Sequence, residues 1–243
     1  MTGNEPVPEV VGTGVIPGWL DRFRVAAPEV EVPELLRPPP GARAAAVLIL
    51  FGEGPHGPDV LLIERAAHLN KHAGQPAFPG GGIEPDDDGP VAAALREARE
   101  ETGLDPAGVE ILAVLPEVHL SRSGYRVTPV AGWWREPSAE FTHDPGEVAL
   151  VARVPLAELT DPANRLYVRH VPAKRGGSGG SPPQGRSSAG YAGPAFKVGG
   201  MLVWGFTAML LTQVLKAGGW DRPWDHDRVE DLPPEVLDLA SRG

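Results

Sequence analysis

The sequence predicts one α+β domain that contains several strands and two main helices. Three observations lead to this prediction. Two short apolar runs near residue 50 suit neighbouring buried strands, only two long segments have helical character, and 42% of the 243 residues are hydrophobic. A chain of this length and composition buries a substantial core in one or two domains. We expect the domain to span residues 43–220, with a partly ordered N-terminal extension over 1–42 and a C-terminal tail over 221–243.

The N-terminal extension alternates prolines with acidic residues and contains one amphipathic patch. The patch consists of Trp19, Leu20, Phe23 and Val25. It favours a short helix that packs on the domain. Three consecutive prolines at 38–40 then end any helix and mark the start of the domain.

Apolar runs of strand length follow this boundary. Residues 44–51 are rich in Val, Leu and Ile and indicate a buried strand, and residues 60–63 give a second strand after a turn. Further strands are expected at 109–119, 127–134 and 148–154.

Two segments are predicted to be loops. Residues 65–88 have no apolar periodicity and contain three consecutive glycines. Irregular connections of this length are uncommon in compact domains unless they are functional, so we expect a functional loop. Residues 173–189 are rich in Gly, Ser and Pro and predict a flexible surface loop.

The two main helices are predicted from composition and end signals. Residues 91–102 are rich in Ala, Leu, Glu and Arg, with Pro90 suited to a first helical turn and Gly103 suited to the position after the helix. Residues 201–217 predict a closing helix, whereas 155–159 allow at most one helical turn.

Composition excludes several classes of function. The chain has 32 acidic and 22 basic side chains, a formal charge of −10, which argues against a general nucleic-acid or membrane-surface binder. Cysteine is absent, so disulfides, thiolate catalysis and Cys-ligated metals are excluded. The most apolar stretch, 201–215, is too short for a bilayer, and the N-terminus lacks the basic start of a signal peptide. We expect a soluble cytoplasmic protein.

Acidic side chains are concentrated around the first main helix, and helical spacing decides which of them meet. Glu97, Glu100 and Glu101 project from one side of the helix. Arg96 precedes Glu100 by four residues, so its planar fork can hold that carboxylate. Acids this close near the C-terminal end of a helix favour a hard divalent ion, Mg²⁺ or Mn²⁺, between them. The alternative is an exposed helix in which Arg96 and Arg99 partly neutralise the acids.

Together these residues resemble the signature of Nudix hydrolases, G-x5-E-x7-R-E-U-x-E-E-x-G-U, in which U is aliphatic. The helical half of the signature stands at 96–104 as REAREETGL. Gly82 and Asp88 fit the spacing of the first half, with aspartate in place of glutamate. Alternatively, Gly81 pairs with Asp87 and one extra residue precedes the helical half.

A second motif resembles the one found upstream of the signature in coenzyme A diphosphatases, L-L-T-x-R-[SA]-x3-R-x3-G-x3-F-P-G-G. Here it stands as LLIERA at 61–66, Gly74 and FPGG at 78–81. Two positions depart from the pattern, because Ile63 replaces Thr and Asn70 replaces the second Arg. The resemblance covers about residues 43 to 220, without 173–189.

The resemblance implies a Nudix α/β/α sandwich, in which a mixed sheet lies between helices. It also implies that Glu97, Glu100 and Glu101 ligate Mg²⁺ or Mn²⁺ and that Arg96 orients Glu100. The general base is left open. It is either a carboxylate of the signature, Glu97 or Glu100, or Glu147 at the start of a predicted strand.

The substrate that the resemblance implies is coenzyme A or acyl-CoA, cleaved to 3′,5′-ADP and (acyl-)4′-phosphopantetheine. Arg65 and Lys71 would meet its phosphate charge. Gly80, Gly81 and Gly82 would let the backbone approach it closely. No nucleic-acid or membrane partner is expected, and a homodimer is one option for the oligomeric state.

Two other functions remain as alternatives. One is a Nudix hydrolase of another nucleoside diphosphate derivative, such as ADP-ribose or NADH. The other is a catalytically silent Nudix domain that binds a nucleotide as a regulator, although such a domain would be expected to have lost a carboxylate of the signature.

Overall fold

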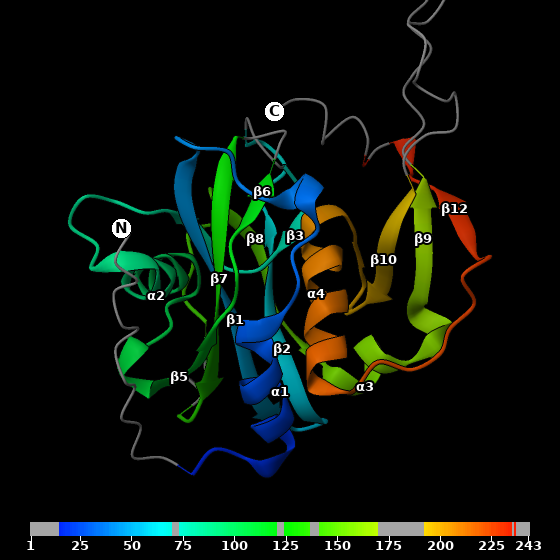
Figure 1. Cartoon of the computed structure of the whole chain (residues 1–243), viewed down its shortest axis with the longest axis horizontal. Coiled ribbons are helices and arrows are strands. Elements are labelled where there is room, and N and C mark those ends of the chain that lie inside the picture. The colour runs from blue at the N-terminus through cyan, green and yellow to red at the C-terminus, as the bar shows by residue number, and fades with distance from the viewer. Residues whose placement is uncertain are drawn as a thin grey trace, which may run out of the picture.

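The computed structural model describes residues 15–69, 73–120, 124–136, 141–169, 192–234 and 236. Within these residues, eight strands form a mixed sheet at the centre of the molecule (Figure 1). They are β1 (Arg43–Gly54), β2 (Gly57–Arg65), β3 (Pro76–Ala77), β4 (Gly80–Gly82), β5 (Val109–Val114), β6 (Val118–Leu120), β7 (Tyr125–Trp134) and β8 (Val148–Pro155). The main order is β3-β2-β1-β7-β5, while β4, β6 and β8 pair with β1, β7 and β2. The long pair β1 and β7 runs parallel, which makes the sheet mixed.

Helices cover both faces of this sheet, so the predicted α/β/α sandwich is confirmed (Figure 1). Successive residues of a strand face opposite sides. Leu48 and Leu50 of β1 therefore pack with α2 (Gly89–Thr102), whereas Ile49 and Phe51 pack on the other side with α1 (Asp21–Ala26) and α4 (Gly205–Gly218). Helix α2, which carries the acidic side chains, therefore packs on the half of β1 that pairs with β4.

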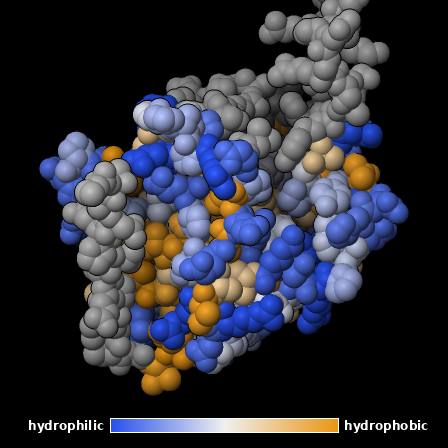
Figure 2. Space-filling view, in the orientation of Figure 1, coloured by the Kyte–Doolittle hydropathy of each residue, from blue (hydrophilic) through white to orange (hydrophobic). Residues whose placement is uncertain are grey.

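The N-terminal extension contributes to the core. Leu20 and Phe23 are fully buried around α1, as the predicted amphipathic patch requires. Val25 is the exception, since 78% of it is exposed. Figure 2 shows hydrophobic areas toward the left of a face that is otherwise largely hydrophilic.

A second sheet lies beside α4, and the sequence did not predict it (Figure 1). Its order is β11 (Met201–Val203), β10 (Ala192–Val198), β9 (Arg165–Arg169) and β12 (Val229–Asp231). The pairing of β12 with β9 brings residues of the predicted C-terminal tail onto this sheet. A short helix, α3 (Leu156–Thr160), follows β8 where at most one turn was expected. Short 3-10 helices occur at Gly18–Leu20, Ala27–Glu29, Glu34–Leu36, Pro106–Gly108 and Pro162–Asn164.

Three predicted elements have different bounds in the structure. The strand expected at 109–119 is split into β5 and β6, because Pro116 between them has no backbone N–H to donate. The loop expected at 65–88 contains β3 and β4. The closing helix begins at Gly205 and not at 201, because Gly199 and Gly200 have positive φ angles and turn the chain into a β10–β11 hairpin. The loop predicted at 173–189 lies outside the described residues.

Candidate active site

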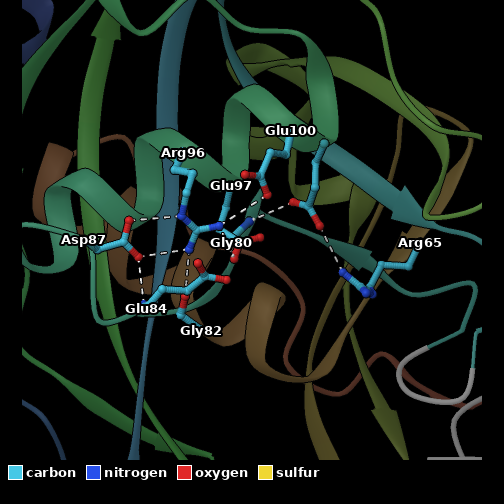
Figure 3. A network of polar contacts seen from close by, with 9 residues as sticks. Arg65, Gly80, Gly82, Glu84, Asp87, Arg96, Glu97 and Glu100 are labelled. Carbon is cyan, nitrogen blue, oxygen red and sulfur yellow. Dashed lines mark hydrogen bonds and ion pairs between the residues drawn. The ribbon is translucent and has the colours of Figure 1, made fainter.

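Helix α2 positions the acidic side chains, and its ends follow the predicted signals. Pro90 lies in the first turn, and Gly103 ends the helix with a φ of 72°, which favours glycine. A Cβ on Gly103 would lie 2.8 Å from the carbonyl oxygen of Thr142, so the close packing also requires glycine there. Ala93, Ala94 and Ala98 are buried against the sheet. This packing leaves the signature's arginine and glutamates on the side of α2 that faces β4 (Figure 3).

Arg96 is the centre of a polar network (Figure 3). Its Nη1 donates to Oε1 of Glu97 at 3.1 Å and to Oε2 of Glu100 at 3.3 Å. Its Nε and Nη2 donate to the two oxygens of Asp87, each at 3.0 Å. Nη2 also donates to the carbonyl oxygen of Gly82 at 3.0 Å. Arg96 thus contacts Glu100 as its spacing predicts, and it also ties the helix to the preceding loop.

The contact between Arg96 and Asp87 distinguishes the two possible alignments of the loop with the first half of the signature. Asp87 also accepts a hydrogen bond from the backbone N–H of Glu84 at 2.8 Å. The hydrogen bonds from Arg96, and next that from Glu84, lower the pKa of Asp87. Asp88 occupies the cap position of α2 but accepts no side-chain capping bond. The contacts therefore favour the alternative register, in which Gly81 pairs with Asp87.

The three glycines of β4 are held against β1 for different reasons. Gly80, Gly81 and Gly82 pair with residues 45–47 of β1. A Cβ on Gly80 would lie 2.3 Å from the carbonyl oxygen of Ala46, and one on Gly81 would lie 2.3 Å from Oε1 of Glu97. A Cβ on Gly82 would meet no atom within 4 Å. Close approach of the β1 backbone therefore requires glycine at Gly80, whereas a side chain at Gly81 would force the flexible Glu97 carboxylate to move.

Glu101 is the most enclosed of the three glutamates, with 5% of the residue exposed. Its Oε2 accepts the backbone N–H of Gly80 at 2.9 Å, and its Oε1 accepts Nη1 of Arg65 at 3.1 Å (Figure 3). Burial raises the pKa of Glu101 to about 7, although the Gly80 N–H and the Arg65 charge oppose the shift. The nearby charges of Glu97 and Glu147 add to the rise. Arg65, predicted to meet substrate phosphate, is thus paired with a predicted metal ligand.

The other two glutamates of the signature lie progressively closer to solvent. The Glu97 side chain is 18% exposed, and burial raises its pKa against the opposing effect of Arg96. The Glu100 side chain is 56% exposed and touches Arg96 alone among the described contacts. Along one side of α2, exposure to solvent therefore increases from Glu101 through Glu97 to Glu100.

Glu147 and Lys71 are the remaining residues of the site that the sequence predicts. Glu147 immediately precedes β8, is exposed, and its carbonyl oxygen accepts the backbone N–H of Ala66 at 2.9 Å. This bond places Glu147 next to the end of β2, where its charge acts on Glu101. Its role as a base stays a prediction. Lys71 lies outside the described residues.

The donor set fits a hard divalent cation by its chemistry. All three side chains offer carboxylate oxygens, the ligands that such ions prefer, and burial raises the pKa of both Glu97 and Glu101. In the described parts of the chain, however, no three His, Cys, Asp or Glu side chains converge closely enough to hold a metal. Arg65 and Arg96 engage these acids instead.

Comparison with known proteins identifies the family of the chain. The family description of the NUDIX domain matches residues 41–174, just over half of the chain. The chain is 44% identical over 140 residues to the uncharacterized Nudix hydrolase NudL of Shigella flexneri, covering 58% of this chain and 69% of that protein. The protein of the same name in Escherichia coli strain K12 is 43% identical over the same shares. The crystal structure of the Nudix hydrolase RenU from M. smegmatis is 26% identical, with a TM-score of 0.41 over 48% of this chain and 73% of that one.

The chain therefore belongs to the Nudix family. It is a Nudix hydrolase, an enzyme that acts on pyrophosphate bonds, and a nucleoside diphosphate derivative is the class of substrate that these matches support. Enzymes of this family generally use divalent metal ions. None of the helices in the described segments is both long and apolar enough to cross a membrane.

Sequence reasoning missed two features of the site. The first is the contact of Arg96 with Asp87, which the alternative register would have indicated. The second is the pairing of Arg65 with Glu101, 36 residues apart, for which no local pattern exists. Cytoplasmic location and a homodimer stay predictions.

Proposed function

We propose that this hydrolase cleaves the diphosphate bond of coenzyme A or acyl-CoA, giving 3′,5′-ADP and (acyl-)4′-phosphopantetheine, with Mg²⁺ or Mn²⁺. One observation carries the proposal. Two residues from separate blocks of the coenzyme A-type motif, Arg65 and Gly80, both donate a hydrogen bond to Glu101 of the Nudix signature. The motif that resembles a substrate-recognition element is thus joined directly to the acids that would carry the chemistry.

The acids of α2 have distinct roles in this proposal. Glu97, Glu100 and Glu101 would hold the divalent ions, which supply positive charge to offset that of the diphosphate. Arg96 keeps Glu97 and Glu100 on one side of the helix through Nη1, while its contacts with Asp87 and Gly82 fix its own position. Gly81 leaves the space that the Glu97 carboxylate occupies.

Three carboxylates are candidates for the general base. Glu97 and Glu100 lie next to one another on the helix, and Glu100 is open to solvent from which a water can enter. Glu147 immediately precedes β8, and its charge acts on Glu101. A base must lie within hydrogen-bond reach of the water it activates.

Recognition of the substrate would use cations at the end of β2. The Arg65 guanidinium is suited to phosphate because its planar fork can donate two parallel hydrogen bonds. Lys71 is close to Arg65 in the chain and would add positive charge toward the 3′-phosphate. Gly80, Gly81 and Gly82 would let the diphosphate approach the backbone of β4.

Product analysis tests this proposal. Purified protein is incubated with coenzyme A and Mg²⁺ or Mn²⁺, and the products are separated by chromatography. We expect 3′,5′-ADP and 4′-phosphopantetheine, and slower cleavage of dephospho-CoA, which lacks the 3′-phosphate. Equal rates on the two compounds would contradict recognition of that phosphate.

The departures from the coenzyme A motif favour a second candidate substrate class. Ile63 and Asn70 replace a threonine and an arginine of the pattern. Loss of an arginine weakens the case for an extra phosphate and fits ADP-ribose or NADH, which lack the 3′-phosphate of coenzyme A. Faster cleavage of ADP-ribose than of coenzyme A under the same conditions would favour this candidate.

A further inference from the structure

Three threonines lie in the two long helices, α2 and α4, and one of them uses its hydroxyl differently from the others. Thr102 and Thr212 each donate to the carbonyl oxygen four residues earlier in their own helix, at 2.6 and 2.8 Å. Thr207 lies in the first turn of α4, where the residue four positions earlier is outside the helix. Its hydroxyl instead donates to the carbonyl oxygen of Pro76 at 2.9 Å, and Thr207 is only 6% exposed. The Thr207 hydroxyl therefore makes a buried tertiary contact between segments 131 residues apart in the chain.

The contact is made to β3, a strand of two residues at the end of the main order of the sheet. Along that order β3 has a strand neighbour on one side only, β2, and Pro76 has no backbone N–H to add to the pairing. A short edge strand of this kind has few hydrogen bonds with which to hold its place. Helix α4 stands between the main sheet and the second sheet (Figure 1), and β11, which leads into α4, also contacts β3. Thr207 thus fixes β3 from the side of α4.

Strand β3 lies between the two groups that hold Glu101. Immediately before the strand, the carbonyl oxygen of Gln75 accepts the N–H of Arg65 at 3.2 Å, and the Arg65 side chain donates to Glu101. After the strand, the carbonyl oxygen of Pro79 accepts an N–H of β1 at 2.8 Å, and the N–H of Gly80 donates to Glu101. A displacement of β3 would therefore reach both partners of the Glu101 carboxylate.

We propose that Thr207 is a positioning residue of the active site. Its hydroxyl holds the Pro76 carbonyl, and through β3 it sets where Arg65 and the Gly80 N–H lie relative to Glu101. Thr207 is outside residues 41–174, which match the NUDIX domain, so α4 adds to the site a contact that this match does not include. The inference rests on the proposed function for the role of Arg65 toward substrate, whereas the placement of β3 can be measured without any substrate.

Backbone hydrogen exchange, followed by mass spectrometry, measures this placement directly. Thr207→Val keeps the branched shape of the side chain but removes the donor, so the buried Pro76 carbonyl loses this partner. We expect the amides within 74–80 to exchange about tenfold faster than in wild type, while those of 60–63 in the centre of β2 stay within about twofold. Thr207→Ser keeps a hydroxyl and should exchange within about threefold of wild type over 74–80. Unchanged exchange over 74–80 in Thr207→Val, or an equal increase in both segments, overturns the inference.

Thr212→Val is the matched control, because it removes the same hydroxyl from the same helix but breaks only a contact within α4. Its exchange over 74–80 should stay within about twofold of wild type. If Thr212→Val accelerated exchange there as much as Thr207→Val does, the effect would come from loosening of α4 in general, and the positioning role of Thr207 would be refuted. Circular dichroism melting checks that each variant folds. If Thr207→Val does not fold, Thr207→Ala replaces it with the same expectation, since it places no methyl group against the Pro76 carbonyl.

Steady-state kinetics then tests whether the placement matters for the reaction. Turnover of coenzyme A, or of ADP-ribose if the wild type cleaves that compound instead, is measured with Mn²⁺ well below the melting temperature of every variant. We expect kcat/KM of Thr207→Val to fall about tenfold, mainly through a higher KM, with Thr207→Ser and Thr212→Val within about threefold of wild type. A wild-type kcat/KM for Thr207→Val would contradict the inference. If the wild type cleaves neither compound, the proposed function fails, while hydrogen exchange still decides the role of Thr207.

Discussion

Two arginines hold the acids of the active site, and they do so in opposite ways. Arg96 contacts Asp87, Glu97, Glu100 and the Gly82 carbonyl, and it uses all three of its nitrogens. Arg65 contacts Glu101 through a single nitrogen. The difference indicates that Arg96 ties α2 to the preceding loop, whereas the described contacts of the Arg65 side chain join the end of β2 to one carboxylate. The predictions below test this division, from the largest expected effect to the smallest.

Removing the charge of Glu101 should have the largest effect on activity. Glu101→Gln keeps the shape of the side chain but loses a carboxylate that the proposal assigns to the metal. We expect turnover to fall about 1,000-fold or more, equivalent to about 4 kcal/mol of transition-state stabilisation. Steady-state kinetics measures this loss, and the melting temperature should stay near that of wild type. Glu34→Gln, at an exposed side chain remote from α2, is the control. Full activity of Glu101→Gln would contradict the assignment.

Substitution of Arg96 should loosen the link between α2 and the preceding loop without removing a ligand. Arg96→Lys keeps the charge but has no planar fork to hold Asp87 and the two glutamates together. We expect activity to fall about 10- to 100-fold, as is typical when the groups that orient metal ligands are lost. If Arg96→Lys were as active as wild type, this role of Arg96 would be wrong.

Alanine substitutions at the adjacent glycines Gly81 and Gly82 can be compared directly, because the added Cβ would meet Glu97 at only one of the two positions. Gly81→Ala would bring a Cβ to 2.3 Å from the Glu97 carboxylate, whose flexible side chain must then move, whereas Gly82→Ala meets nothing within 4 Å. We expect Gly81→Ala to lower activity about tenfold with little change in melting temperature, and Gly82→Ala to do less. Similar activities for the two variants would show that the space beside Glu97 is unimportant.

The pH dependence of metal binding should reveal the buried carboxyl group. Because the pKa of Glu101 is raised to about 7, its proton must leave before an ion binds below that pH. Affinity for Mn²⁺ should therefore rise by up to about tenfold per pH unit below pH 7 and level off above it. Titrations at pH 6, 7 and 8 measure this, and Glu101→Gln should lose the dependence.

The same group links pH to the stability of the metal-free protein. The folded-state pKa of about 7 lies above the ordinary glutamate pKa of 4.5, so the folded state holds the proton more tightly. Its contribution to the free energy of unfolding is therefore fully present below pH 4.5 and is lost as pH rises through 7, by at most about 3 kcal/mol. Urea unfolding of wild type and Glu101→Gln at pH 5 and 8 compares the two. An equal pH dependence in both would contradict the raised pKa.

Much of the first sheet and of α2 could be predicted because their signals are local. The continuous apolar run at 44–51 explains the buried strand β1, and the Ala-rich face with Gly103 at its end explains α2. The link from Arg96 to Glu100 likewise follows from a spacing of four residues.

The second sheet and the Arg65 contact could not be predicted in this way. Strands β9, β11 and β12 have three to five residues each, and β9 pairs with a segment more than 50 residues away. Short strands of this kind depend on tertiary pairing more than on their own pattern. Arg65 and Glu101 meet only because the end of β2, the start of β4 and α2 come together in the tertiary structure.

A crystal structure of the protein with bound Mn²⁺, located by anomalous scattering, tests the central account most directly. We predict the ion coordinated by the carboxylates of Glu97 and Glu101. An ion bound away from α2 would contradict the account.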